Sequence, residues 1–366
     1  MTCERIVPWL CYRAGGLGGP FPMLLIRDAQ KADLPHLKRL AAVLNTVNLS
    51  DDDESLERLV DTSVRSFAGK VKNPFEREYL FVLEDTGAGA VIGTSLVIAQ
   101  HGTYDAPHIY YEVSEREHYS ASIDRHFRHK VLSIAYNYEG PTEIGGLVVD
   151  PRHRSGPDKP GKQLSYVRFL YLAMHRANFR DRVLAELLPP LMPDGRSVLW
   201  ESIGKKFTGL TYSEADKLSR QNKEFIKELF PSSDIYVTLF PERAQKVLGE
   251  VGPQIRGVQR MLERIGFRYV ERVDPFDGGP HFEAKTSEVT LVQKFRTARV
   301  TAEDLASELG EDFLVGVERE SGRTRFRAAR SRARIDDQVV YLPAETKELL
   351  GVASGVKLSL VPFEGA

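Results

Sequence analysis

The stretch that decides the fold reads Ile144-Gly-Gly-Leu-Val-Val149, followed by Asp150-Pro-Arg-His-Arg-Ser-Gly-Pro-Asp-Lys-Pro-Gly-Lys162. Its first six residues are apolar or glycine, which is typical of a buried strand. A polar loop follows over residues 150–160. Apolar residues then recur at helical spacing and predict a helix over residues 161–179. The pattern is therefore strand, loop and helix.

This loop has the composition of an anion-binding site. A loop rich in glycine between a strand and a helix start offers backbone N–H groups and the positive end of the helix dipole, ideally to a pyrophosphate. Four basic side chains add charge: Arg152, Arg154, Lys159 and Lys162. The loop is neither a Walker loop, which needs a Lys-Ser/Thr pair, nor a G-x-G-x-x-G loop.

Strands and helices alternate outward from this stretch in both directions, which predicts an α/β fold. Before it, the pattern predicts a strand at 23–26, helices from about residues 34 and 56, and a hairpin of strands 79–83 and 91–99. After it, the expected strands are 182–188, 235–239, 267–273 and 282–292. The expected helices are 199–207, 215–229, one after Pro241, and one through residues 258–265.

Residue composition and hydrophobic periodicity divide the chain into three parts. Residues 1–22 hold glycines and prolines without periodicity and are expected to be a flexible leader. Residues 23–297 carry the alternating pattern and are expected to form the main domain. Residues 298–366 hold short β-like segments around one helix near Ala344 to Leu350, which predicts a small β-rich C-terminal lobe.

Composition narrows the class of protein. The 366 residues carry 50 Lys and Arg against 51 Asp and Glu, a formal charge of −1. This balance gives no reason to expect a nucleic-acid or membrane-surface partner. Two cysteines, Cys3 and Cys11, make no disulfide framework, and no apolar run is long enough to span a membrane. A soluble, cytoplasmic protein is expected.

Five of the nine histidines fall between residues 101 and 140: His101, His108, His118, His126 and His129. Metal binding is one interpretation. Their spacing, however, fits no H-x-x-x-H pair except, loosely, His126 and His129, and carboxylates are not placed along the sequence to complete a site. We therefore expect a polar insertion on the surface, and no metal site.

Seven arginines fall between Arg319 and Arg334, and Arg323, Arg325 and Arg327 alternate as on one face of a strand. Contact with phosphate or RNA is one interpretation. A strand edge protected by charge is the interpretation we favour.

Two passages resemble the GNAT acyltransferases. The strand, basic loop and helix of residues 144–179 are similar to the arrangement with which these enzymes hold the pyrophosphate of coenzyme A, and Leu262-Glu-Arg-Ile-Gly-Phe-Arg268 resembles their closing helix and strand. Longer passages resemble the arginine N-succinyltransferase family, whose members start near Met23. They include Leu147-Val-Val-Asp-Pro151, Ala185-Glu186, Leu199-Trp-Glu-Ser-Ile-Gly204, Tyr212-Ser-Glu-Ala-Asp216 and Asp274-Pro-Phe-Asp-Gly-Gly-Pro280.

The resemblance implies a GNAT-like fold, no permanently bound cofactor, succinyl-CoA as the co-substrate, and the α-amino group of L-arginine as the acceptor. It also implies that Leu147 contacts the acyl donor. From the residues themselves, we expect backbone groups of Leu147, Val148 and Val149 to pair with the pantetheine arm and to polarise the thioester carbonyl. The phosphates are expected on Arg152, Arg154, Gly161 and Lys162.

The chain departs from the family at its acid/base residue. Family members carry a histidine, assigned as proton donor, in Gly-x-Val-His-Pro, whereas this chain has Gly249-Glu-Val-Gly-Pro253. Gly252 cannot donate a proton. Amine attack on a thioester mainly needs proximity and a polarised carbonyl, so activity need not vanish. The family usually has threonine where this chain has His281, and we hypothesise that His281 is the catalytic acid/base; the alternative is a histidine at the rim of the site.

The acceptor would be recognised through its charges. A guanidinium is best bound by a bidentate carboxylate. Three acidic residues in family-like passages are candidates, although each could instead cap a helix: Glu201, Asp216 and Asp277. An α-carboxylate would need an arginine or lysine that the sequence does not identify.

Three functions stay open at this stage. The first is an arginine N-succinyltransferase, and the second is an N-acyltransferase with another amine or acyl-CoA. The third is a non-catalytic partner subunit, because this family includes paralogous pairs that assemble together. A homo-oligomer, or a hetero-oligomer with a paralogous subunit, is accordingly among the expected partners.

Overall fold

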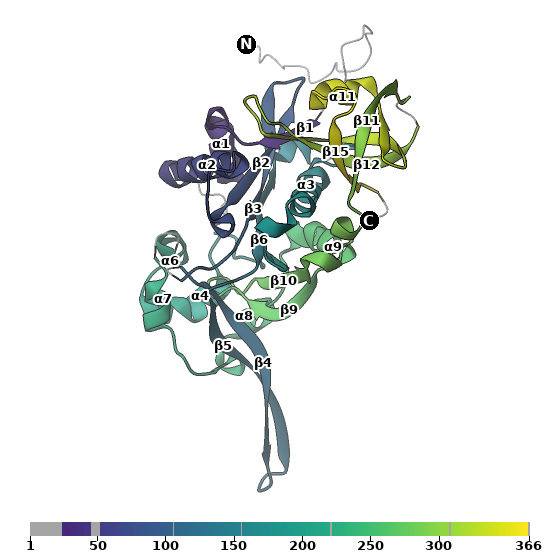
Figure 1. The fold of residues 1–366 in the computed structure, drawn as a ribbon. Coiled ribbons are helices and arrows are strands. Elements are labelled where there is room, and N and C mark those ends of the chain that lie inside the picture. The colour runs from purple at the N-terminus through teal and green to yellow at the C-terminus, as the bar shows by residue number, and fades with distance from the viewer. Residues whose placement is uncertain are drawn as a thin grey trace, which may run out of the picture.

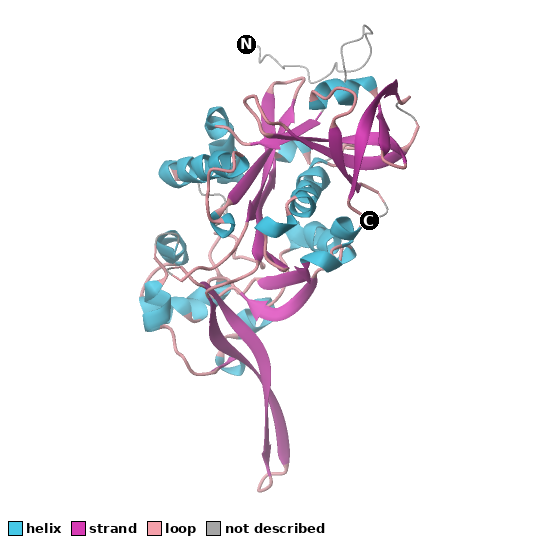
Figure 2. Cartoon of the chain, viewed as in Figure 1, coloured by secondary structure: helices cyan, strands magenta, loops and turns pink. Residues whose placement is uncertain are grey.

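The computed structural model describes residues 24–44, 52–104, 106–154, 156–219, 222–306 and 309–364. The expected leader, with both cysteines, and Ser155 of the basic loop lie outside these residues. The described chain is a mixed α/β structure in which helices pack on both faces of an extended sheet (Figure 1, Figure 2). The predicted α/β class is confirmed in this mixed form.

The strands are β1 (Leu24–Asp28), β2 (Glu78–Asp85), β3 (Ala90–Ile98), β4 (His108–Ser120), β5 (Arg125–Asn137), β6 (Thr142–Val149), β7 (Arg182–Glu186), β8 (Ile235–Tyr236), β9 (Arg268–Val273), β10 (Pro280–Lys285), β11 (Arg296–Asp304), β12 (Glu311–Glu318), β13 (Phe326–Asp336), β14 (Val339–Leu342) and β15 (Lys357–Pro362). The helices are α1 (Leu34–Leu44), α2 (Asp53–Phe67), α3 (Pro160–Met174), α4 (Val198–Ser202), α5 (Gly204–Thr208), α6 (Tyr212–Ser219), α7 (Glu224–Leu229), α8 (Glu242–Val247), α9 (Arg256–Arg264), α10 (Thr290–Gln293) and α11 (Ala344–Leu350).

The sheet runs in the order β12-β15-β11-β14-β13-β1-β2-β3-β6-β7-β10-β9-β4-β5-β8. Two neighbouring pairs, β6/β7 and β11/β14, are parallel, and the other neighbouring pairs are antiparallel. The parallel pair β6/β7 is joined by α3, since parallel neighbours need a crossover that a tight turn cannot supply. The strand, loop and helix predicted around residue 150 thus form the crossover at the centre of the sheet.

Strand β2 shows that both faces of the sheet are covered by apolar side chains. Tyr79 and Phe81 belong to the apolar cluster that contains α3, whereas Leu80 and Val82 belong to the cluster formed with α1 and α2. Successive side chains of a strand point to opposite faces, so a strand covered on both faces reads as a continuous apolar run. Helices α1 and α2 therefore cover one face and α3 the other (Figure 1).

Helix α3 is the most deeply buried helix among those described, with apolar contacts on most sides. It packs on β3 and β6 and also on β12 and β15 of the C-terminal part. It ends at Met174, earlier than the predicted residue 179, and a short 3-10 helix (Arg176–Asn178) follows. No described helix has the length and apolar character needed to cross a bilayer.

Residues 101–140 depart most from the expectation of a polar surface insertion. Strands β4 and β5 form a long hairpin whose outer half projects from the body, in agreement with that expectation (Figure 1). Its inner end is different, because Ile109, Tyr111 and Leu132 enter an apolar cluster with helices α4 to α7. His108 at the start of β4 is also buried. The expectation is therefore wrong for the inner end, where apolar residues alternate among the histidines.

The C-terminal segment, β11 to β15 with α11, has an apolar cluster of its own that also takes in Leu25. Helix α11 occupies the predicted residues. Strand β13 is hydrogen-bonded to β1, β12 and β14, so the arginine-rich strand is interior, and its prediction as a protected edge is wrong. The strand predicted over 282–292 ends at Lys285, because Thr286 donates hydrogen bonds to the carbonyls of Asp181 and Arg180.

Candidate active site

A gap opens in the middle of the sheet where β6 and β7 part. Their parallel pairing consists of two residue pairs, Thr142 with Val183 and Glu143 with Leu184. Beyond these pairs, β6 runs on to Val149 beside β3, and β7 runs on to Glu186 beside β10. The last residues of β6 and β7 therefore each keep one strand edge turned toward the gap.

The β6 side of the gap carries Leu147, Val148 and Val149. The register with β3 shifts just before Val148, and Gly146 there has φ of +56°, which glycine adopts without strain. Val148 and Val149 are buried, and Leu147 packs partly exposed against the α3 cluster. A bulge of this kind interrupts the ladder and re-aims backbone groups, and the Val149 carbonyl here accepts a hydrogen bond from Arg154 of the loop that follows.

The loop that leaves β6, residues 150–162, is here called the cationic loop. The Asp150 carboxylate accepts a hydrogen bond from the backbone N–H of Arg152 at 3.0 Å, and the Arg152 guanidinium pairs with it at 2.7 Å. This guanidinium holds the pKa of the Asp150 carboxyl well below its usual range. Arg154 donates from Nε to the Val149 carbonyl at 2.9 Å. Both arginines thus stiffen an exposed loop and keep further N–H groups in solvent.

Two lysines of the cationic loop converge on one carboxylate. Lys159 Nζ lies 2.7 Å from Glu364 Oε1, and Lys162 Nζ lies 3.4 Å from Glu364 Oε2. Lys159 has φ of +50°, a left-handed conformation that non-glycine residues seldom adopt. A Cβ added at Gly161 would meet Val149 at 3.9 Å, an ordinary contact. A carboxylate from the C-terminal end therefore lies at the N-terminus of α3, where an anion is favoured.

The wall of the gap at the end of β7 holds a group of side chains that we call the histidine cluster: His101, His108, Glu186 and His281. Glu186 Oε1 lies 3.3 Å from Nε2 of His108, 3.4 Å from Nε2 of His281 and 4.0 Å from Nε2 of His101. His281 is directly opposite Glu186 in the β10/β7 register, and its ring stacks on that of His108. His281 is fully buried, so it is not a residue of the rim.

The protonation of the histidine cluster follows from burial and from Glu143. Burial, with the nearby charge of His101, lowers the pKa of His108 to about 3, and burial also lowers the pKa of His281. Burial acts in the same direction on His101, but Glu143 Oε2 lies 2.6 Å from its Nδ1 and raises its pKa. At neutral pH, His108 and His281 are therefore neutral, and each has a nitrogen lone pair.

Acidic residues lie beside the histidine cluster. The Asp274 carboxylate accepts hydrogen bonds from the backbone N–H of Phe276 and of Asp277, and Asp277 Oδ1 accepts one from Gly279 at 2.7 Å. Burial and the charge of Glu186 raise the pKa of Asp274 to about 7. Burial also raises the pKa of Asp277, with added contributions from Asp274, Glu186 and Asp216. The structure thus brings Asp216 and Asp277 into one electrostatic group with Glu186.

Glu201, the third candidate for the acceptor, lies outside that group. Its Oε2 is 3.0 Å from Lys205 Nζ and 3.9 Å from an Arg196 nitrogen. Gly252, where the resemblance implies a histidine in other members, lies close to the chain that continues β7. Its N–H donates to the Leu188 carbonyl, and an added Cβ would lie 3.0 Å from the carbonyl oxygens of Leu188 and Pro189. A side chain at 252 would therefore displace its neighbours.

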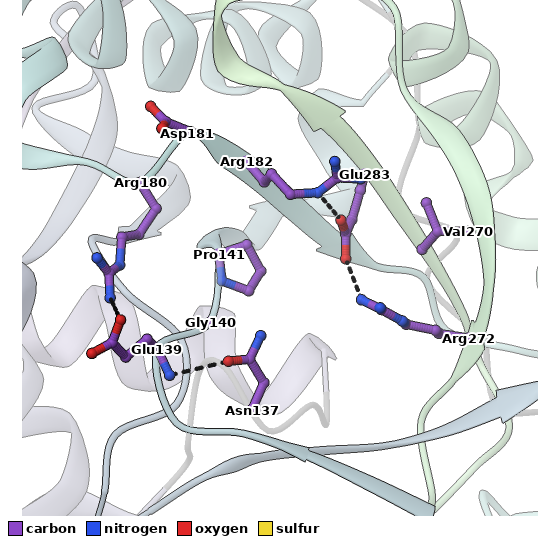
Figure 3. A pocket seen from close by; sticks show the side chains of 10 residues that line it. All are labelled: Asn137, Glu139, Gly140, Pro141, Arg180, Asp181, Arg182, Val270, Arg272 and Glu283. Carbon is purple, nitrogen blue, oxygen red and sulfur yellow. Dashed lines mark hydrogen bonds and ion pairs between the residues drawn. The ribbon is translucent and has the colours of Figure 1, made fainter. Parts of the chain in front are cut away.

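A cavity of about 580 Å³ lies on the same face of β7 and β10 as Glu186 and His281. Its arginines are Arg180, Arg182 and Arg272, and Glu283 binds two of them, with 2.6 Å to Arg182 and 3.3 Å to Arg272 (Figure 3). Arg272 also stacks on the Tyr110 ring, which contacts the rings of His108 and His281. The cavity therefore reaches the histidine cluster through aromatic and charged contacts.

A comparison with known protein families establishes the family to which this chain belongs. The model of the family described as arginine N-succinyltransferase beta subunit matches residues 24–291, which include β6, the cationic loop, Glu186 and His281. The chain belongs to the arginine N-succinyltransferase family. The resemblance drawn from its motifs is confirmed, and this membership makes the chain an N-acyltransferase enzyme by class.

Relatives in the arginine N-succinyltransferase family extend over almost the whole chain. The arginine N-succinyltransferase of Yersinia pestis (strain Pestoides F) is 32% identical over 348 residues, covering 93% of this chain and 97% of the relative. The arginine N-succinyltransferase subunit alpha of Pseudomonas aeruginosa is 33% identical over 349 residues, covering 93% and 99%. The solved structure of arginine/ornithine succinyltransferase subunit AI from Pseudomonas aeruginosa matches with a TM-score of 0.81 at 30% identity, covering 94% of this chain and 100% of that chain.

Within this family member, sequence reasoning missed four residues around His281: His101, His108, Glu143 and Glu186. His101 and His108 were set aside because no carboxylate lies near them in the sequence. The carboxylates come from other strands, Glu143 from β6 and Glu186 from β7. Alternation along β7 and β10 would have placed Glu186 opposite His281, had their register been known.

Proposed function

We propose that this chain transfers the succinyl group of succinyl-CoA to the α-amino group of L-arginine. The observation that carries the proposal is the gap between β6 and β7, which has a cationic loop at the end of one strand and the histidine cluster at the end of the other. One end suits a nucleotide diphosphate, and the other suits an amine that must lose a proton. The names of the family and of its relatives give arginine as the acceptor and succinyl as the transferred group, which supports this choice of substrates.

The acyl donor is proposed to lie along β6. Backbone groups of Leu147, Val148 and Val149 would pair with the pantetheine arm, and an N–H at the bulge would polarise the thioester carbonyl. The diphosphate would lie over the start of α3, on Arg152, Arg154, Gly161 and Lys162. Glu364 must then release Lys159 and Lys162, an exchange of one anion for another at the same place.

The acceptor is proposed to lie against the histidine cluster. Its guanidinium would face Asp216 and Asp277, whose charges are close enough to influence one another. Its α-carboxylate would reach into the arginine-lined cavity, where Arg182 and Arg272 share a single glutamate and keep N–H groups to offer. Glu201 is occupied by Lys205, so it is the weakest of the three candidates.

The reaction then needs few groups. The amine nitrogen attacks the thioester carbon, a C–N bond forms, the C–S bond breaks, and the thiolate leaves with coenzyme A. His281, neutral and held by Glu186, would take the proton that the attacking amine gives up. A thiolate is a good leaving group and needs little protonation, which is consistent with glycine at position 252.

The finer features of the fold belong to the same proposal. We propose that residues 23–297 form a GNAT-like domain, supported by the order β1-β2-β3-β6-β7-β10-β9 and by the crossover through α3. Residues 298–366 are proposed as a C-terminal lobe, because they have an apolar cluster of their own, although β11 already begins at Arg296. A cytoplasmic location is proposed from the low cysteine content.

The non-catalytic alternative keeps one observation in its favour, the glycine at position 252. The names of two relatives contain the word subunit, and we propose that this chain also forms a homo-oligomer or pairs with a paralogous subunit. In a pair, the partner could supply the proton acceptor. This alternative predicts that the purified chain binds succinyl-CoA without turning it over.

The test is release of free thiol from succinyl-CoA by the purified chain, with and without L-arginine. We expect release that depends on L-arginine and an acylated amine product seen by mass spectrometry. Arginine-independent release, or none, would contradict the proposal. A panel of ornithine, lysine and agmatine, and a second panel of acetyl-CoA and glutaryl-CoA, would show whether another amine or acyl group is preferred.

A further inference from the structure

The histidine cluster has a geometry that proton transfer alone does not require. Ligand atoms of His101, His108 and Glu186 all lie within 4.8 Å of one another, and they come from three separate parts of the chain. We propose that these three side chains bind one divalent transition-metal ion, with Zn²⁺ as the representative ion, and leave a further coordination position open. The proposal concerns binding and does not rest on the transferase activity proposed above.

The distances between the ligand atoms are close to those between the ligands of a bound zinc ion. Two ligands bound at about 2.0–2.1 Å in a tetrahedral zinc site lie roughly 3.3–3.4 Å apart. Nε2 of His108 and Oε1 of Glu186 are 3.3 Å apart, and Nε2 of His101 is 4.0 Å from the same oxygen. Nε2 of His101 would have to approach Glu186 Oε1 by about 0.6–0.7 Å to reach the separation of a tetrahedral zinc site. All three ligand atoms already lie within 4.8 Å of one another.

The donor set has the chemistry of a zinc site, and one of its members, His108, makes no side-chain hydrogen bond. Two imidazoles with one carboxylate are a recurrent ligand set for zinc. His108 is 1% exposed, and neither of its ring nitrogens makes a hydrogen bond in the structure, although Nε2 faces Glu186. A buried polar atom without a partner has lost its contacts with water and gained nothing in return, which is unfavourable. An ion between His108 and Glu186 would satisfy that nitrogen.

An outer carboxylate orients one of the ligands. Glu143 Oε2 lies 2.6 Å from Nδ1 of His101, so in the neutral imidazole the hydrogen belongs on Nδ1 and the lone pair on Nε2, which lies 4.0 Å from Glu186 Oε1. Metal-binding histidines commonly donate their second ring N–H to a carboxylate in this way, which fixes the tautomer and raises the basicity of the ligand. Glu143 is itself buried on β6.

Two of the three ligands keep part of their side chains in contact with solvent: His101 is 20% exposed and Glu186 is 24% exposed. Gly140 and Pro141 line the arginine-rich cavity, and the backbone N–H of His101 donates to the Pro141 carbonyl at 2.7 Å (Figure 3). The carbonyl of His101 packs so closely on Gly140 that an added Cβ there would clash with it. The backbone of His101 is therefore in direct contact with the cavity wall.

His281 stands next to the proposed site without belonging to the ligand group. Its Nε2 is 3.4 Å from Glu186 Oε1, the carboxylate oxygen that would bind the ion, and neither ring nitrogen of His281 makes a hydrogen bond in the structure. Three protein ligands with an open position are the pattern of a catalytic rather than a structural zinc site. An ion bound here would face the same gap in which the acceptor amine is proposed to lie.

The experiment measures Zn²⁺ binding to the full chain after removal of metal with a chelator. Equilibrium dialysis against Zn²⁺, followed by metal analysis, is expected to give about one ion per wild-type chain. His101→Ala is expected to lower the affinity at least 100-fold. The matched control is His126→Ala, which also removes a histidine that lies beside a glutamate, Glu117, but on the exposed hairpin. The control is expected to bind as the wild type does.

Two further measurements keep the result interpretable. Glu143→Gln keeps all three ligands and is expected to weaken Zn²⁺ binding about 10- to 100-fold, since it removes only the outer carboxylate. Co²⁺ added to the wild-type chain is expected to give the visible absorption of a low-coordinate site, and His101→Ala to abolish it. Circular dichroism of each variant confirms that it is folded. Binding of less than a tenth of an ion per wild-type chain, or equal binding by folded His101→Ala, would overturn the proposal.

Zn²⁺ is the probe throughout, with neither succinyl-CoA nor L-arginine present. A chain that binds no Zn²⁺ but releases thiol would refute the metal site and leave the proposed transferase intact. A chain that binds Zn²⁺ through His101 but turns over no substrate would do the reverse.

Discussion

The cationic loop and the histidine cluster lie at the ends of two neighbouring strands and are built in opposite ways. The loop is one exposed run of sequence whose charges pair with nearby groups such as Asp150 and Glu364. The cluster has His108 and His281 fully buried and His101 and Glu186 partly buried, and it draws each of its four side chains from a different segment, beginning with the turn after β3. The loop is proposed to bind through charge in water, and the cluster is proposed to act through a few oriented groups largely removed from water.

The difference in burial between the loop and the cluster determines how strongly substitutions in each are expected to affect catalysis and substrate binding. Charges in contact with solvent are screened, so one exposed ion pair contributes about 0–1 kcal/mol. Groups in a buried cluster interact more strongly and have fixed geometry. Substitutions in the cluster should therefore change the chemical step by orders of magnitude, whereas those in the loop should change substrate affinity modestly.

The largest effect is expected at Glu186. Glu186→Gln keeps the volume of the side chain but removes the carboxylate on which three imidazoles converge. We expect kcat for L-arginine-dependent thiol release to fall about 1000-fold, because all three imidazoles, including that of the proposed proton acceptor His281, lose the charge around which they are arranged. Circular dichroism and thermal unfolding would show whether the variant is folded. A kcat within threefold of the wild type would show that the cluster is not part of the chemistry.

His281→Asn comes next. Asparagine approximates the shape of the imidazole near the backbone but does not accept a proton at neutral pH. We expect kcat to fall about 100-fold with little change in KM for succinyl-CoA, since the donor is proposed to lie along β6 and over the cationic loop. The measurement is steady-state kinetics for both substrates. If kcat were unchanged, His281 would be a structural residue, and the proton acceptor would have to be another group.

The cationic loop should respond in KM rather than kcat. Lys159→Ala combined with Lys162→Ala removes the two ammonium groups that now hold Glu364. We expect KM for succinyl-CoA to rise about tenfold, the sum of two exposed charge contacts, with kcat nearly constant. Lys38→Ala is the control, because Lys38 also forms an exposed ion pair, with Asp53, but on α1. A fall in kcat of the same size would remove the contrast between the two regions.

The smallest effect is expected at Glu364. Glu364→Gln leaves Lys159 and Lys162 without their intramolecular anion, so a phosphate no longer has to displace a carboxylate. We expect KM for succinyl-CoA to fall about twofold at low salt, and the difference from wild type to shrink as salt is added. Calorimetry with coenzyme A would measure the same change. A rise in KM would mean that Glu364 positions the lysines for the donor instead of competing with it.

Much of the fold could be predicted from local patterns. The strand, loop and helix around Asp150 are at the expected residues, as are α11, the first two helices and the hairpin of β2 and β3. These elements carry continuous apolar runs or clear helical periodicity, which burial on one or two faces imposes. The inner end of the β4/β5 hairpin was missed because histidine and tyrosine alternate with its apolar residues. The position of β13 was missed because local charge does not reveal which strands pair.

The candidate site divides in the same manner. The cationic loop and His281 were predicted because their signals are local: basic residues before a helix, and one departure from a family passage. The partners of His281 could not be predicted, because Glu186 meets it only through the register of β7 with β10. His101 finds Glu143 only because the turn after β3 lies at the start of β6.

The sequence by itself determined most of the elements, the basic loop between β6 and α3, and the family, since each depends on neighbouring residues and on the period of a helix or a strand. Tertiary structure alone decided which imidazoles meet which carboxylates, that Glu364 holds the two lysines, and that the arginine-rich strand is interior. The physical reason is that pairing across a sheet brings together residues tens to hundreds of positions apart, and burial then changes the chemistry of the groups that meet.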